Sequence, residues 1–194
     1  MRSLRQSFLA LVVASLSLVW TGCIHYEMMP PTPTPKVATT APAKGKILLK
    51  SVTDTRTTKT KHEAPGRTPV MVMGNFVFCT DEKVESVLER LLVEGFARRG
   101  YELTRSVEAD GTVDATVTWF DGKNHTAMWS LSMQADLRCS ITVTKGGRTQ
   151  TFEVAGHGKN LCQVNRDENA QLALTRTYAD FLDNLDRELE KAGL

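Results

Sequence analysis

The side chains best suited to chemistry in this chain are those of its cysteines and histidines. They are Cys23, Cys79, Cys139 and Cys162, and His25, His62, His125 and His157. A thiol can act as a nucleophile, bind a metal, form a disulfide or carry a lipid, and a histidine can act as a base or a metal ligand. These residues show no metal-ligand spacing, and no Ser-His-Asp or Cys-His set can be assembled from them. A disulfide cysteine and a histidine at a strand end explain Cys162 and His157 better than a catalytic pair does. We therefore predict no catalytic residue, no metal site and no cofactor.

Cys23 directly follows a segment with the features of a bacterial export signal. Arg2 and Arg5 begin this segment, an apolar run covers residues 8–19, and Trp20-Thr21-Gly22 leads to the cysteine. A basic start, a short apolar middle and a small residue before the cut are typical of a secretory signal. The segment also resembles the lipobox of bacterial lipoproteins, with Trp20 in place of the usual leucine. We predict cleavage after Gly22 and lipid attachment to Cys23. The alternative is an ordinary secretory signal that leaves Cys23 as a free thiol.

The residues after Cys23 predict the membrane to which the domain is anchored and the segment that connects the two. By resemblance to lipoproteins of this kind, Ile24 after the cysteine implies the outer membrane, with the domain facing the periplasm. Five prolines between residues 30 and 42 favour an extended chain. The sequence therefore divides into a signal peptide (1–22), a lipidated cysteine with a Pro-rich tether (23–45) and a periplasmic domain (46–194).

The charge balance argues against one class of partner. The chain has 24 basic and 22 acidic side chains, and the signal removes two arginines and no acid. A neutral mature chain gains no general attraction to nucleic acid. We expect membrane contact through the lipid and a protein partner in the cell envelope, and no nucleic acid.

Hydrophobic periodicity predicts two helices. Apolar residues at steps of three and four indicate one helix that begins at Thr80 and ends before Gly100, and a second that begins at Asn165 and ends near Lys191.

Alternation and turn residues predict the strands. Strands are expected at 46–52, 69–74, 101–104, 114–120, 133–143 and 151–155, with turns at Asp121-Gly122 and Gly146-Gly147. In the strand 114–120, Ala115, Val117 and Trp119 fall on one side. Strands with one apolar and one polar face predict an α+β two-layer sandwich, a mostly antiparallel sheet with two helices packed on one face.

The polar face of the longest predicted strand is a candidate partner surface. It consists of Gln134, Asp136, Arg138, Ser140 and Thr142. The loop 53–68 is locally basic and contributes Arg56, which could contact a protein, a glycan or a lipid headgroup. The alternative is that both surfaces are only solvated.

The remaining cysteines predict one disulfide. Cys79 and Cys162 each precede a predicted helix, and an exported protein meets an oxidising compartment. We expect these two residues to pair and Cys139, within an apolar series, to be a small core side chain. The alternative is three free thiols.

Residues 46–194 resemble the YajG-type bacterial lipoproteins. The matching pieces are Ser51-Val-Thr-Asp54-Thr-Arg56, Arg99-Gly100-Tyr101, Ala115-Thr-Val-Thr, Trp129, Gly146-Gly147-Arg148, and the helix from Glu168-Asn169 to Leu185. The resemblance implies an envelope lipoprotein of α+β fold without an established enzymatic activity. The leading hypothesis is a non-enzymatic binding or structural role. The alternative is a ligand- or lipid-carrying auxiliary subunit of a transport system, which would need an apolar pocket between helices and sheet.

The predicted lipid attachment can be tested by a single substitution. Cys23→Ala should move the mature protein from the membrane fraction to the soluble periplasm, because the acyl chains supply the anchor. Fractionation followed by immunoblotting measures this, and an unmodified Cys23 at the mature N-terminus in a mass spectrum would contradict it.

Overall fold

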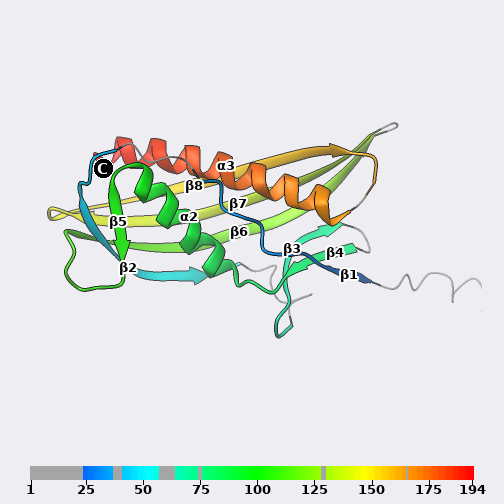
Figure 1. Ribbon diagram of the computed structural model, residues 1–194, viewed down its shortest axis with the longest axis horizontal. Helices are drawn as coiled ribbons and strands as arrows, with labels where there is room; N and C mark the ends of the chain where they lie inside the picture. Colours follow the sequence, from blue (N-terminus) through cyan, green and yellow to red (C-terminus); the bar gives the residue numbers. More distant parts are fainter. Residues whose placement is uncertain (1–23, 37–40, 57–63, 74–75, 128–129, 165) are drawn as a thin grey trace, which may run out of the picture.

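The computed structural model describes residues 24–36, 41–56, 64–73, 76–127, 130–164 and 166–194. In chain order its elements are β1 (His25–Met28), β2 (Gly45–Asp54), β3 (Thr68–Met73), β4 (Phe76–Thr80), α2 (Val84–Arg98), β5 (Tyr101–Thr104), β6 (Gly111–Ala127), β7 (Ser130–Lys145), β8 (Arg148–Cys162) and α3 (Asp167–Lys191). The body is a five-stranded sheet with two helices, and a three-stranded sheet lies toward one end (Figure 1).

The five-stranded sheet has the order β5-β2-β6-β7-β8 and is mixed. Strand β2 pairs in parallel with β5 and β6, whereas the β6–β7 and β7–β8 pairs are antiparallel. The α+β class is confirmed, and the expectation of a mostly antiparallel sheet is corrected. The parallel pairs arise because the chain leaves β2 and returns through helix α2, and a crossover of this kind joins parallel strands.

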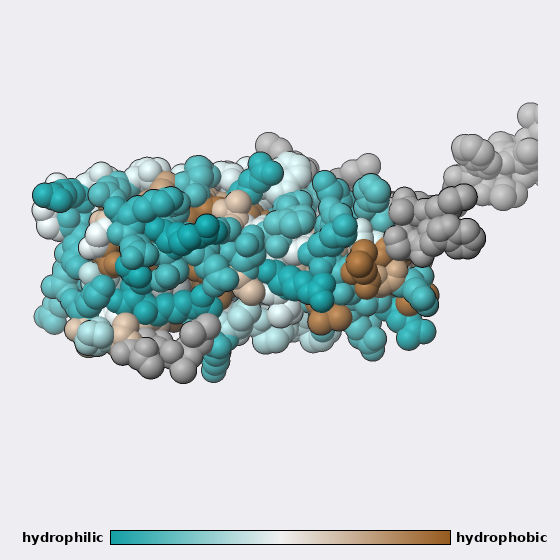
Figure 2. All heavy atoms as spheres, turned by 90° about the horizontal axis from the view of Figure 1, so that it is seen from above, coloured by the Kyte–Doolittle hydropathy of each residue, from teal (hydrophilic) through white to brown (hydrophobic). Residues whose placement is uncertain are grey.

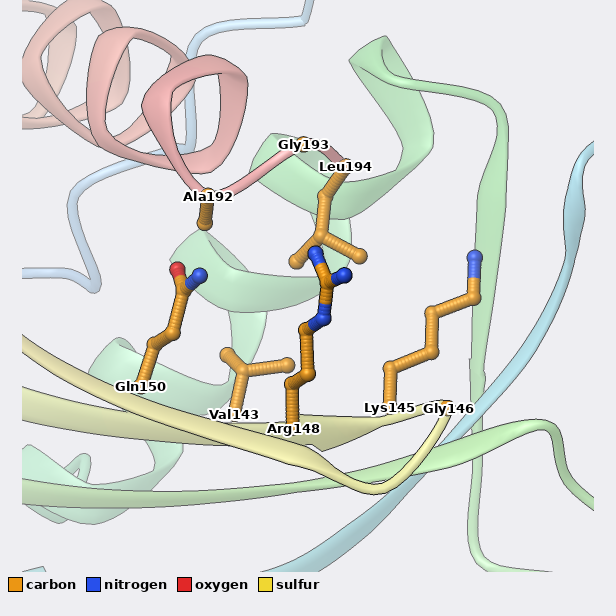
Figure 3. Close-up of a pocket in the computed structure, with 8 residues that line it drawn as sticks. All are labelled: Val143, Lys145, Gly146, Arg148, Gln150, Ala192, Gly193 and Leu194. Atoms are coloured by element: carbon orange, nitrogen blue, oxygen red, sulfur yellow. The ribbon is translucent and has the colours of Figure 1, made fainter.

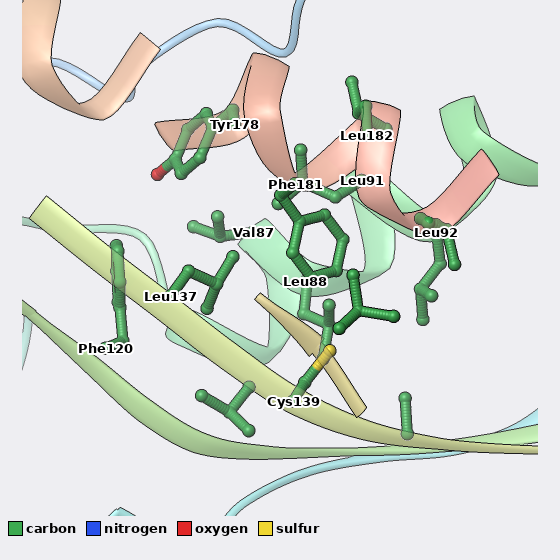
Figure 4. Packing of buried hydrophobic residues seen from close by; sticks show 14 of the residues in the cluster. Val87, Leu88, Leu91, Leu92, Phe120, Leu137, Cys139, Tyr178, Phe181 and Leu182 are labelled. Atoms are coloured by element: carbon green, nitrogen blue, oxygen red, sulfur yellow. The ribbon is translucent and has the colours of Figure 1, made fainter. Parts of the chain in front are cut away.

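Both helices cover the same face of this sheet. The predicted apolar stripes of α2 and α3 are all buried, and they form one cluster with the inward residues of β2, β6, β7 and β8. Figure 4 shows the side chains of both helices meeting above Leu137 and Cys139 of β7. The periodicity of the sequence therefore predicts the buried faces of both helices correctly.

Helix α3 approaches strand β8 very closely, because two glycines face it. A Cβ atom at Gly156 would lie 2.3 Å from the carbonyl oxygen of Thr177, and one at Gly158 would lie 2.0 Å from that of Ala173. The Thr177 hydroxyl donates at 2.9 Å to the carbonyl oxygens of Ala135 and Ala173. The helix backbone therefore rests directly on the strand backbone.

The three-stranded sheet has the order β1-β4-β3. The short edge strand predicted near residue 70 is β3, which pairs antiparallel with β4. Strands β1 and β4 were not predicted. Strand β1 pairs in parallel with β4, so residues from the expected tether belong to the folded domain.

The Pro-rich segment after β1 also packs on the domain. Met29 and Thr32 are buried, and the Met29 N–H donates to the Cys79 carbonyl at 2.8 Å. The Arg90 guanidinium donates to the Thr32 carbonyl and the Thr34 hydroxyl. The expectation of a tether is wrong for residues 25–36, because these hydrogen bonds and the burial of Met29 and Thr32 hold the segment against the domain.

Two local predictions are corrected by the structure. Asp121-Gly122 is not a turn, because β6 continues through it to Ala127; Gly122 instead leaves room for Met71, whose Cγ would lie 2.2 Å from a Cβ there. The first predicted helix does not begin at Thr80, whose hydroxyl accepts the Glu82 N–H; α2 begins at Val84. Asn165, the predicted start of the second helix, lies outside the described residues. The turn at Gly146-Gly147 is confirmed, with φ values of +57° and +76°.

We expect Gly158→Ala to lower the free energy of unfolding by about 1–3 kcal/mol, because overpacking forces the backbone of α3 away from the sheet. Urea denaturation measures this. The matched control is Ala155→Val, which adds methyl groups on the exposed side of the same strand and should change stability by less than about 0.5 kcal/mol. Equal denaturation midpoints for both variants would contradict the close approach of α3.

Candidate functional site

The residues singled out by the sequence lie in different environments. Cys23, His62 and Trp129 lie outside the described residues. Gln134, Asp136, Arg138, Ser140 and Thr142 share the face of the five-stranded sheet opposite the helices, as predicted, and alternate with buried residues. Arg56 and the cysteines lie elsewhere.

The expected Cys79–Cys162 disulfide is not formed, and Cys79, Cys139 and Cys162 are free thiols. The prediction required both cysteines to precede helices from one sheet. Cys79 instead lies within β4 of the three-stranded sheet, whereas Cys162 ends β8 of the other sheet. Cys139 is buried in the core as expected, and burial raises the pKa of both Cys139 and Cys79.

Arg56 is not an accessible partner residue, which corrects the sequence prediction. Its side chain is 2% exposed and forms a bidentate ion pair with Asp54, with nitrogen–oxygen distances of 2.8 and 2.9 Å. It also donates to the Phe120 carbonyl at 3.1 Å and lies over the Phe120 ring. Asp54 and Arg56 therefore join the end of β2 to β6, a structural role in which removal of one partner is costly.

Several side chains on the uncovered sheet face bond to one another across neighbouring strands. Asp136 of β7 accepts a 2.7 Å hydrogen bond from Nδ1 of His157 on β8. Further pairs across neighbouring strands are Ser51–Asp114, Thr53–Thr116, Thr142–Thr151 and Thr144–Thr149. Cross-strand pairs of this kind stabilise a sheet by a few tenths of a kcal/mol to about 1 kcal/mol each.

Burial shifts one carboxyl group at this face. Asp121 of β6 lies opposite Asp136. Burial raises the pKa of Asp121, an effect to which the nearby Asp136 charge adds, and the Gly122 N–H and Arg56 oppose it. Because its pKa is raised, Asp121 binds its proton more tightly than a solvent-exposed aspartate does.

Trp119 is a feature of this face that the sequence prediction placed wrongly. A β-bulge between Val117 and Trp119 shifts the register of β6 by one residue, so that Trp119 lies opposite Arg138. The indole is 39% exposed instead of buried with Ala115 and Val117. Strand alternation could not reveal this, because a bulge interrupts the period of two.

Arg138 lies beside Trp119 with an exposed side chain. Among the described residues, its guanidinium group has no hydrogen bond or ion pair, in contrast to its paired neighbours Asp136 and His157. An exposed tryptophan thus lies beside an arginine without a side-chain partner among the described residues, on a face where several polar side chains are hydrogen-bonded in pairs. We refer to Trp119 and Arg138 together as the Trp–Arg pair.

A hollow of about 360 Å³ lies at the other end of the domain from β1, between the β7–β8 turn and the end of α3 (Figure 3). Lys145, Arg148 and Gln150 rise from the strands toward Ala192–Leu194. Lys145 donates a 2.7 Å hydrogen bond to the Tyr101 hydroxyl. The hollow is open and lined by charged groups, in contrast to the apolar pocket that a lipid carrier would need.

Within the parts of the chain that the structure describes, no three His, Cys, Asp or Glu side chains lie close enough to hold a metal ion. In the same described parts, no helix combines the length and apolar character needed to cross a membrane.

Comparison with known proteins gives similarities of shape only. No protein-family model matches the sequence, and no curated protein matches it. Similar solved structures include an uncharacterised protein (TM-score 0.48, 15% identity, covering 84% of this chain and 99% of that one). A Xanthomonas campestris protein of the DUF330 family has a TM-score of 0.49 and 11% identity, with 86% and 99% covered. A hypothetical protein from Chlamydia trachomatis has a TM-score of 0.45 and 10% identity, with 76% and 96% covered.

The thiols should differ in reactivity with maleimide. In the Cys23→Ala variant, we expect Cys162 to be modified in the folded protein and Cys79 and Cys139 only after unfolding, because buried thiols are shielded and their raised pKa disfavours the reactive thiolate. Peptide mass spectrometry with and without urea measures this. A Cys79 that reacts as fast as Cys162 without urea, or a crosslinked Cys79–Cys162 peptide, would contradict the structure.

Proposed function

We propose that the protein is an outer-membrane-anchored periplasmic lipoprotein of the YajG-like type, and that its domain binds another envelope protein without catalysing a reaction. The sequence features before and at Cys23 support the anchor. The observation that carries the binding role is the Trp–Arg pair on the uncovered sheet face.

Tryptophan and arginine are enriched among residues that dominate protein interfaces, and such residues lie near the centre of a contact surrounded by weaker ones. Trp119 offers a rigid apolar surface, and Arg138 offers donors that are not engaged within the described domain. The surrounding Thr–Thr and Asp–His pairs are already formed, so binding would order few further side chains. This arrangement suits recognition of a surface that carries a carboxylate beside an apolar group.

The quoted lipoprotein motifs occupy structurally demanding positions, which supports the proposed family. Asp54 and Arg56 form the buried ion pair. Gly100 has φ +84°, and a Cβ there would lie 2.2 Å from the Pro42 carbonyl oxygen. Gly146 and Gly147 form the left-handed β7–β8 turn.

The second candidate function is a ligand- or lipid-carrying subunit of an envelope transport system. The hollow near Lys145 and Arg148 is the observation in its favour. The core argues for the first candidate, because Phe78, Phe96, Phe120 and Phe181 are fully buried where an acyl chain would need space. Charge at the hollow would suit an anionic headgroup more than an apolar chain.

We expect Arg138→Glu to reduce crosslinking to the envelope partner at least about tenfold, because loss of an interface hot spot costs 2 kcal/mol or more. The measurement is crosslinking in living cells with the lipidated protein, followed by quantitative mass spectrometry. Trp119→Ala should have a similar effect. The matched control is Arg148→Glu, a charge reversal at the hollow, which should leave crosslinking unchanged.

The outcomes separate the two candidate functions. Loss of cellular function in Arg148→Glu alone would favour the ligand carrier. A folded Arg138→Glu variant that crosslinks to the partner as strongly as the wild type would contradict the proposed surface. Replacing His62 and His125 together should leave function intact; loss of function in that folded variant would contradict a non-catalytic role.

A further inference from the structure

The exposed apolar side chains of the domain are unevenly distributed. In the described parts of the chain, the large exposed hydrophobic residues are Ile24, Met28, Phe76, Val93, Val107, Trp119, Leu161, Val164 and Leu172. Figure 2 shows brown side chains gathered toward the end of the molecule that holds β1. Single exposed apolar residues are common, but a group at one end indicates a contact.

Six of these residues belong to that end. Ile24 and Met28 lie directly before and at the end of β1, and Phe76 begins β4, where its ring contacts His25 with centroids 5.3 Å apart. Leu161 lies at the end of β8, Leu172 lies near the start of α3, and the Val164 carbonyl accepts a hydrogen bond from Asn169 in the first turn of that helix. We call these six residues the apolar end.

The apolar end is also where the chain would meet its anchor. Only Ile24 separates Cys23 from β1, and β1 is fixed in register with β4 from His25–Phe76 to Met28–Cys79. Two Cα–Cα steps span at most about 7–8 Å. A lipid on Cys23 would therefore hold the folded domain within this distance of the membrane, since the Pro-rich segment follows β1 and adds no length to the connection.

We propose that the apolar end rests on the bilayer, with its side chains at the boundary between headgroups and acyl chains. This inference depends on the lipid anchor of the proposed function. Apolar side chains gain free energy at that boundary, and a lipid chain together with a second contact holds a protein more firmly than one chain. The long axis of the domain then points away from the membrane, and the Trp–Arg pair is presented to the side.

Photocrosslinking in vesicles of phosphatidylethanolamine and phosphatidylglycerol tests this proposal. p-Benzoylphenylalanine replaces Met28 or Phe76 in the lipidated protein, and the mass of the lipid adduct is measured. The matched control replaces Val107, which is apolar and 88% exposed. Val107 lies before Gly111, the first residue of β6, whereas Met71 of the three-stranded sheet packs against Gly122. The eleven residues from Gly111 to Gly122 span about 35 Å at the rise of a strand.

We expect lipid adducts at positions 28 and 76 at least about tenfold above those at 107, because the anchor fixes which end meets the bilayer. Three results with an acylated Cys23 would overturn the membrane contact while the lipoprotein proposal stands. These are no lipid adduct at positions 28 and 76, an equal amount of adduct at position 107, or a crosslink from positions 28 and 76 to a second copy of the chain. An unmodified Cys23 in the same mass spectrum overturns both.

Discussion

The close approach of helix α3 to strand β8 is the constraint on which the rest of the structure depends. Gly156 and Gly158 remove the side chains that would separate helix from strand, and the Thr177 hydroxyl bonds to β7 through the Ala135 carbonyl. Protein interiors pack at high density, so the aromatic and leucine side chains of α2 and α3 fill the remaining space above the sheet. In the described part of the chain, this packed core agrees with the proposal that the domain acts through its surface.

The surface divides into regions of different chemistry. The face opposite the helices carries polar pairs that already satisfy one another, with the Trp–Arg pair among them. The apolar end lies where the chain enters the domain, and the charged hollow lies at the far end of β7 and β8. The proposed membrane contact and the proposed partner surface therefore use different residues, so that neither would block the other.

The sequence predicts features that depend on local periodicity and fails where distant segments meet. The buried stripes of both helices, the alternation of β7 and the Gly146-Gly147 turn follow from neighbouring residues. Strand β1 could not be predicted, because its four residues show no alternation and depend on a parallel partner about fifty positions away. The burial of Arg56 and the exposure of Trp119 likewise result from an ion pair to Asp54 and a bulge in β6. The sequence therefore predicts an exposed Arg56 that is buried, and a buried Trp119 that is exposed.

The central claim is that this lipid-anchored domain has a packed core and binds a partner through its surface. Native mass spectrometry of the mature protein, gently extracted from its own membrane, tests that claim most directly. The account predicts a mass equal to the polypeptide from Cys23 onward plus covalently attached acyl groups and nothing else, because the two helices and the sheet pack their apolar side chains into one cluster. A lipid or other small molecule retained non-covalently in one-to-one ratio would contradict it and favour a carrier.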